Sequence, residues 1–256
     1  MLLLKLILTP LFILVVTLIG RRWGTTVSGW LVGLPLTSAP VAFFFALEHG
    51  AAFASRAALG TLTGTISVAT FCLAYSWLSL RLPWYICLLT SWGAFFASTY
   101  VLEQTSLPLF ASFFVVLLVL SVTITILPKD QPSKPVATPP AWEIAARMLA
   151  ATSFVLIITA SAALLGPRLS GLLTPFPIFA SIFGAFTHAL QGAPAARRVL
   201  RGVIAGSYAF AVFFLTISGF INTTGIAGAF ALALLAALLV QGSSLWLLTK
   251  YSAITQ

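Results

Sequence analysis

The 256-residue chain contains 60% hydrophobic residues and only 7% charged residues. A soluble domain carries about 25% charged residues, so this chain cannot coat a water-facing surface, and its solvent must be lipid. Its net charge of +9 comes from Lys and Arg placed mostly between apolar runs. That pattern is typical of the charges that set membrane orientation, and it argues against a nucleic-acid partner.

Nine apolar runs are long enough to cross a bilayer, which needs about 20 residues per helix. Arg21, Arg22 and Trp23 follow the first run where a small-residue cleavage site would stand, so the run is a membrane helix and not a signal peptide. The second run is the weakest, because Pro35 and Pro40 interrupt it. The predicted spans are 3–20, 28–47, 54–78, 83–101, 107–127, 144–165, 170–190, 199–219 and 226–249.

The second span of each half of the chain carries the most informative pattern for function. Proline inside a helix frees backbone carbonyls, and lipid offers nothing to bond them. A single interruption is more often a packed kink, but paired interruptions in corresponding helices indicate a transport site. The residues predicted to bind substrate are Ser28, Trp30, Pro35, Thr37, Ser38, Pro40, Ser170, Thr174, Pro175, Pro177 and Ser181.

The third span of each half carries glycines four residues apart. Gly60 and Gly64 form one pair, and Gly202 and Gly206 form the other. Such glycines lie on one face of a helix and let another backbone approach closely, so we predict helix packing at both pairs.

Residues 128–142 are rich in proline and charge and are typical of a solvated linker. The linker separates residues 1–127, with four spans and a fifth, from residues 143–256, with four spans. A displacement of 142 residues places Pro35 on Pro177 and also matches several glycines between the halves. These residues determine backbone geometry, so their matches are more informative than matches between apolar residues.

An odd number of spans separates the start of the first half from the start of the second, so the second half enters the bilayer from the opposite side. We therefore predict an all-α polytopic membrane protein with an inverted-topology internal repeat (4 + 1 + 4), as in many secondary transporters. Loop charges predict that the N-terminus is outside and the C-terminus inside. Arg56 and Arg198 align between the halves, yet inversion puts them on opposite sides. An arginine snorkelling at a helix end is the favoured explanation, and a pair of anion-attracting mouths is the alternative.

Ionisable side chains within the apolar runs are few. Glu48 and His188 are candidates for proton coupling, and an interfacial helix end is the alternative, favoured for Glu48. The sequence has neither a nucleotide-binding glycine loop nor metal-ligand spacing, and its four acidic residues offer few general bases. We therefore expect no enzyme, no metal and no cofactor, and we interpret Cys72 and Cys87 as packing residues.

The second half resembles the GlpM-type family of small bacterial inner-membrane proteins, which have four predicted membrane helices in roughly half this length. The resemblance implies two such units joined through a fifth helix, and a location in the bacterial cytoplasmic membrane. It carries no defined chemistry. In the first half, Leu34-Pro35 and Pro40 replace the Pro-Phe-Pro pattern. The matching residues are Gly171-Leu172, Pro175-Phe176-Pro177, Ala180, Gly192, Ala196 and Arg198.

Three functions fit these patterns. The first is a secondary transporter or exporter of a small solute, for which basic mouths would favour an anion. The second is a flippase for a lipid or lipid-linked precursor. The third is a non-transporting membrane partner in cell-envelope or polysaccharide assembly. The first two require a polar cavity near the middle of the bilayer, and the third does not.

Overall fold

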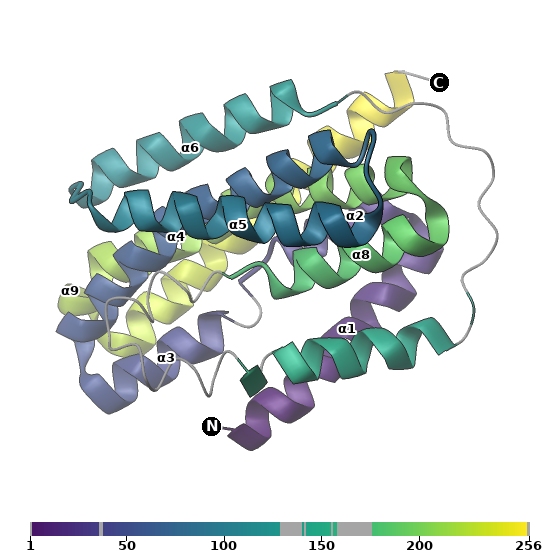
Figure 1. Ribbon diagram of the computed structural model, residues 1–256. Helices are drawn as coiled ribbons and strands as arrows, with labels where there is room; N and C mark the ends of the chain where they lie inside the picture. Colours follow the sequence, from purple (N-terminus) through teal and green to yellow (C-terminus); the bar gives the residue numbers. More distant parts are fainter. Residues whose placement is uncertain are drawn as a thin grey trace.

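The computed structural model describes residues 2–35, 38–128, 140, 142–154, 156–157 and 176–254. Within these stretches the chain is helical and contains no strand (Figure 1). Four helices are long and apolar enough to cross a membrane, which supports a membrane-embedded chain. They are α4 (Ala51–Leu78), α5 (Trp84–Glu103), α6 (Leu109–Ile126) and α9 (Ala193–Ile254), the last considered as far as Ser243.

The predicted spans and the observed helices differ in two places. The span predicted at 28–47 holds two short helices, α2 and α3, on either side of Pro35. The long α9 holds two predicted spans, because Gly225 has non-helical backbone angles (φ 73°, ψ 174°) in its interior. Counted in this way, the described helices fit the nine predicted spans. The remaining helices are α1 (Leu2–Trp23), α2 (Thr25–Val32), α3 (Ser38–His49), α8 (Ile178–Gln191) and an unlabelled helix over 142–154 and 156–157.

Single glycines form the corners between several neighbouring helices. At Gly50 the N–H donates to the carbonyl of Ala46 (3.1 Å), and the Gly50 carbonyl accepts from the N–H of Ala54 (3.1 Å). The chain therefore changes direction without leaving either backbone group of the corner residue unbonded. Positive φ with ψ near 170° is a region that only glycine visits at low energy. The four corners are Gly24, Gly50, Gly192 and Gly225, with φ of 94°, 83°, 86° and 73°.

The centre of the fold is α9, which packs against α2, α4, α6 and α8. Its closest neighbour is α2, where the two backbones touch. A Cβ added at Gly206 would lie 2.3 Å from the Trp30 carbonyl oxygen, and one added at Gly29 would lie 1.9 Å from the Val199 carbonyl oxygen. Gly33 and Gly202 make similar approaches. The crossing is therefore built from a GxxxG pair on each helix, which allows close van der Waals packing without a hydrophobic driving force.

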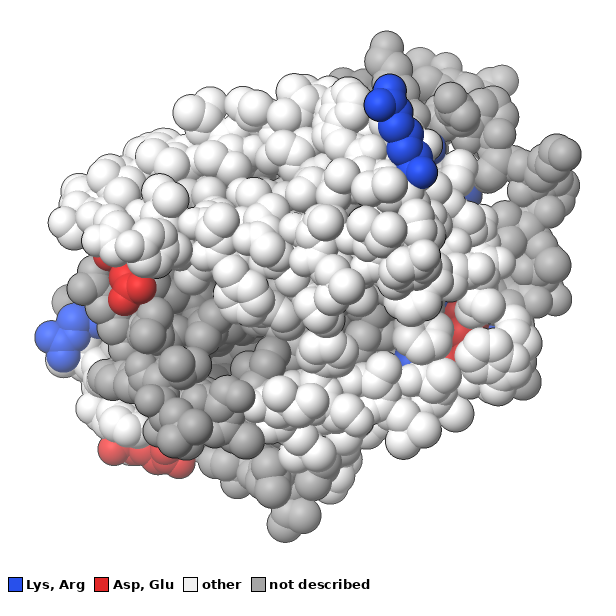
Figure 2. Space-filling view, viewed as in Figure 1, with Lys and Arg blue, Asp and Glu red and all other residues white. Residues whose placement is uncertain are grey.

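Charge and exposure are distributed as a lipid environment requires. Figure 2 shows an almost wholly uncharged face between the two ends of the molecule. Large apolar side chains such as Leu89, Phe114 and Leu118 are exposed on the outer faces of α5 and α6. At one end, Arg197 Nη1 donates to Ser79 Oγ (3.5 Å), and Arg201 reaches carbonyls at the end of α6. This arginine-rich end joins the C-terminal ends of α4 and α6 to the start of α9.

Candidate functional site at the break between α2 and α3

The hydrogen-bond pattern of the backbone changes at the end of α2. The N–H of Gly33 still donates to the carbonyl of Gly29 (3.1 Å), but the N–H of Leu34 donates to Leu31 (3.1 Å), one residue short of the regular pattern. In a continuing helix that N–H would bond Trp30. The tightened final turn thus releases the Trp30 carbonyl at the point where α2 stops.

Gln241 is a donor to the Trp30 carbonyl. Its Nε2 donates to the Trp30 carbonyl oxygen at 3.1 Å, and the residue is only 3% exposed, on the part of α9 that follows Gly225. A buried amide from the far end of the chain therefore satisfies a carbonyl that lipid could not bond. The sequence analysis missed Gln241. Its signal is an amide inside an otherwise apolar span.

The residues around the break contribute differently. Ser28 is buried, and its hydroxyl donates to the carbonyl of Thr25 (2.8 Å). Pro35 and Ser38 are both buried. Pro40 does not break a helix, because it lies in the first turn of α3, where an N–H has no helical acceptor to lose. Thr37, Ser170, Thr174 and Pro175, also predicted to bind substrate, lie outside the described residues.

The start of α8 is packed against α5. Pro177 is buried and directly precedes α8, and its carbonyl accepts from the N–H of Ser181 (2.7 Å). The Ser181 hydroxyl accepts from Trp92 Nε1 (2.9 Å). The ring of Phe176 lies against Phe95, with centroids 5.2 Å apart. The Pro177 carbonyl and the Ser181 hydroxyl are thus both hydrogen-bonded within the protein.

The residues predicted for charge or coupling lie near helix ends. Glu48 and Arg56 are exposed, on either side of the Gly50 corner. Arg198 is half-buried, and its Nε donates to Thr25 Oγ1 (3.4 Å). His188 is half-buried, with its Nδ1 3.3 Å from the hydroxyl of Tyr75.

Of the glycines predicted for packing, Gly202 and Gly206 lie at the crossing with α2. On α4, Gly64 is buried and Gly60 is half-buried. Among the described residues, no group of three His, Cys, Asp or Glu side chains could hold a metal ion.

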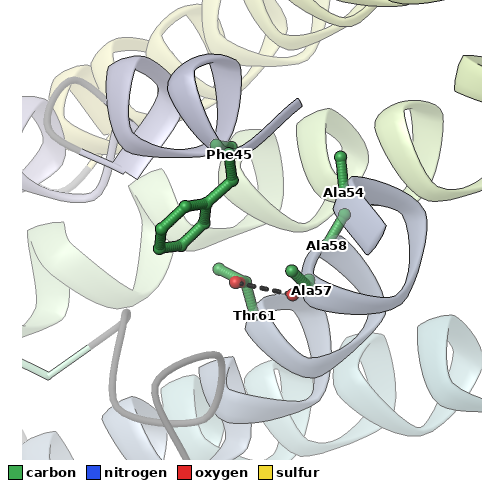
Figure 3. A pocket seen from close by; sticks show the side chains of 6 residues that line it. Phe45, Ala54, Ala57, Ala58 and Thr61 are labelled. Atoms are coloured by element: carbon green, nitrogen blue, oxygen red, sulfur yellow. Dashed lines mark hydrogen bonds between the residues drawn. The ribbon is translucent and has the colours of Figure 1, made fainter. Parts of the chain in front are cut away.

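A separate pocket lies between α3 and α4. It encloses about 250 Å³ of empty space, part of it open to the outside. Figure 3 shows the Phe45 ring from α3 facing a row of small side chains on α4. The one hydroxyl in the lining, that of Thr61, donates to the carbonyl of Ala57 (2.9 Å), so the walls are apolar. The lining residues are Ala42, Phe45, Ala54, Ala57, Ala58 and Thr61.

Comparison with known proteins finds no match to a family model, to a curated protein or to a solved structure. The resemblance to GlpM-type proteins stays a prediction. A functional assignment must therefore rest on the geometry of the chain.

Proposed function

We propose that the chain is a secondary transporter or exporter of a small solute, with its site at the break between α2 and α3 and at the start of α8. The observation that carries this proposal is the bond from Gln241 to the Trp30 carbonyl. An interrupted helix whose carbonyl is held by a side chain can exchange that donor for a solute without further unwinding. Such an activity moves a solute and changes no covalent bond.

The proposal includes an inverted repeat, and equivalent hydrogen bonds support it. The carbonyl of Pro35 accepts from the N–H of Ala39 at 2.7 Å, and the carbonyl of Pro177 accepts from the N–H of Ser181 at 2.7 Å. Both donors and both acceptors are related by the 142-residue displacement. The two prolines thus begin their helices in the same way.

The two corners that follow these helices give a second line of support. Gly50 has φ 83° and ψ 169°, and Gly192, its equivalent, has φ 86° and ψ 168°. Ser55, just after the Gly50 corner, exchanges hydroxyl-to-carbonyl hydrogen bonds with Ser218 (2.7 and 3.0 Å). At the other end, Arg197, just after the Gly192 corner, contacts Ser79 beyond the end of α4 (3.5 Å). The corners therefore lie at opposite ends of an antiparallel pair, as two inverted units require.

Accessibility of the break to water tests the proposal. In a Cys72→Ala/Cys87→Ala background, Ser38→Cys should react with a membrane-impermeant thiol reagent from either side of sealed vesicles, as alternating access requires. Thr105→Cys, in the exposed turn after α5, serves as the reactive control, and Val116→Cys, in the buried core, serves as the unreactive one. If Ser38→Cys stays as unreactive as Val116→Cys from both sides, no aqueous route reaches the break. The transporter proposal would then fail.

A second, lipid-soluble thiol reagent separates the transporter from the flippase. A solute path opens the break to water on both sides, whereas a lipid path opens it laterally to the bilayer. Reaction of Ser38→Cys with a lipid-soluble maleimide, together with no reaction with the impermeant one, would favour the flippase.

A further inference from the structure

A buried ion network lies at the arginine-rich end, away from the helix break. Arg147 and Glu143, on the helix over 142–157, are 3% and 0% exposed, and they form an ion pair one helical turn apart. Arg21, at the end of α1, donates to the other oxygen of Glu143 at 3.2 Å. Figure 1 shows the teal helix that begins at residue 142 next to α1. Glu143 lies in the first turn of its helix and is fully buried.

The carboxylate of Glu143 is shared between two guanidinium groups. Arg147 therefore has only part of one carboxylate to offset its charge. Arg147 Nη2 also donates to Thr187 Oγ1 of α8 (3.3 Å), but Arg147 Nε has no hydrogen-bond partner among the described residues. A buried charged donor without a partner is costly, and proteins rarely keep one without a reason.

The surroundings of Arg147 suit an anion. Its guanidinium lies over the ring of Phe183, 4.7 Å from the centroid, and 5.6 Å from that of Phe186. These apolar walls exclude water and strengthen any charge interaction beside them. A guanidinium edge with a spare Nε–H is the group that binds phosphate or carboxylate oxygens in a fork.

We propose that Arg147, with Thr187 beside it, is a binding site for a phosphate group, which competes with Glu143 for the guanidinium. The group could belong to a soluble phosphate or to a phospholipid head at this end of the protein. Arg147 would hold two phosphate oxygens, and the Thr187 hydroxyl would donate to a third. Binding at Arg147 does not depend on transport through the helix break, so the two proposals stand or fall separately.

Titration of the purified full-length protein with inorganic phosphate, followed by calorimetry in a phosphate-free detergent solution, tests the site. The parent should bind saturably, and Arg147→Gln should not bind. Glu143→Gln removes the internal competitor and should bind about tenfold more tightly. Arg81→Gln is the matched control, because it removes an exposed arginine between α4 and α5 and should bind like the parent.

Two further arms make every outcome decisive. If Arg147→Gln does not fold, the double variant Glu143→Gln/Arg147→Gln replaces it. Removing both charges of a buried pair destabilises a protein less than removing one of them. The double variant should not bind phosphate. The titration is then repeated in phosphatidylcholine nanodiscs with and without phosphatidylglycerol. Weaker phosphate binding with the anionic lipid identifies the lipid head group as the occupant, and unchanged binding identifies a soluble phosphate. Absence of binding in the parent and in Glu143→Gln, or binding unchanged by loss of Arg147, overturns the proposal.

Discussion

The corner between α3 and α4 and the corner between α8 and α9 share a backbone geometry but not a packing. Around the first corner, Ala58 and its neighbours leave a pocket beneath Phe45. The residue 142 positions after Ala58 is Leu200, which is fully buried and fills the equivalent space, 3.6 Å from a Cβ added at Gly184. Half of the residues of α8 are buried, whereas in the described part of α3 only Ser38 and Ala46 are buried.

Under the proposed repeat, the difference indicates which features the two units share. Glycine and proline positions coincide in both halves because they determine where helices start and turn, and few other residues adopt those angles. The side chains between them differ, so one unit is tightly packed and the other is loosely packed. Fewer buried contacts mean a lower free energy of local opening, so α3 is the element expected to move first.

The largest effect is expected at the crossing of α2 and α9. Gly206→Leu would drive a side chain into the Trp30 carbonyl, which a Cβ alone would approach to 2.3 Å. We expect the variant to fail to fold or to lose more than about 3 kcal/mol of stability, measured by thermal melting of the purified protein. Gly64→Leu, at the equivalent buried position of the first half, should also destabilise. Gly93→Leu, on an exposed face where an added Cβ would meet no atom within 4 Å, should melt like the parent; equal melting of all three would remove the packing role of these glycines.

A smaller effect should separate the two packings directly. Leu200→Ala opens a cavity in the tight unit and should lower the free energy of unfolding by about 3 kcal/mol. Ala58→Val, at the equivalent position, enters existing space and should change it by less than about 1 kcal/mol. Unfolding in a graded detergent titration measures both. Equal and large losses would mean that the pocket between α3 and α4 does not accommodate a larger side chain.

The smallest effect should be the same in both units. Gly50→Ala and Gly192→Ala force alanine into a region of positive φ, which costs about 2 kcal/mol. The nearest obstacle is Pro194 Cδ, 3.8 Å from a Cβ at Gly192, and nothing lies within 4 Å at Gly50. Strain should therefore dominate in both variants, and their losses in thermal unfolding should agree. A much larger loss at one corner would show that the two corners are not equivalent.

The sequence predicted those parts of the fold that depend on local properties. Apolar length identified the helices, and proline marked the region where α2 gives way to α3. The sequence predicted only one side of the close crossing of α2 and α9. Gly202 and Gly206 were predicted to pack, but their partners Gly29 and Gly33 were not. That partnership joins residues far apart in the chain, and spacing within one helix cannot reveal it.

The polar contacts were the least predictable part. Gln241 bonds a carbonyl more than two hundred positions away in the chain, and its role depends on where α2 stops. Glu143 and Arg147 are both buried, and Glu143 forms ion pairs with Arg147 and with Arg21, which lies more than a hundred positions earlier in the chain. The inverted topology, the orientation and the transport site stay predictions.

The single-glycine corners also bear on how the protein is made. A hydrated loop between two membrane helices must be threaded through or held outside while its flanking helices insert. Gly50 and Gly192 leave no such loop, since each glycine is bonded to the helix before it and the helix after it. We therefore expect the two helices on either side of each corner to insert into the membrane together, as one hairpin.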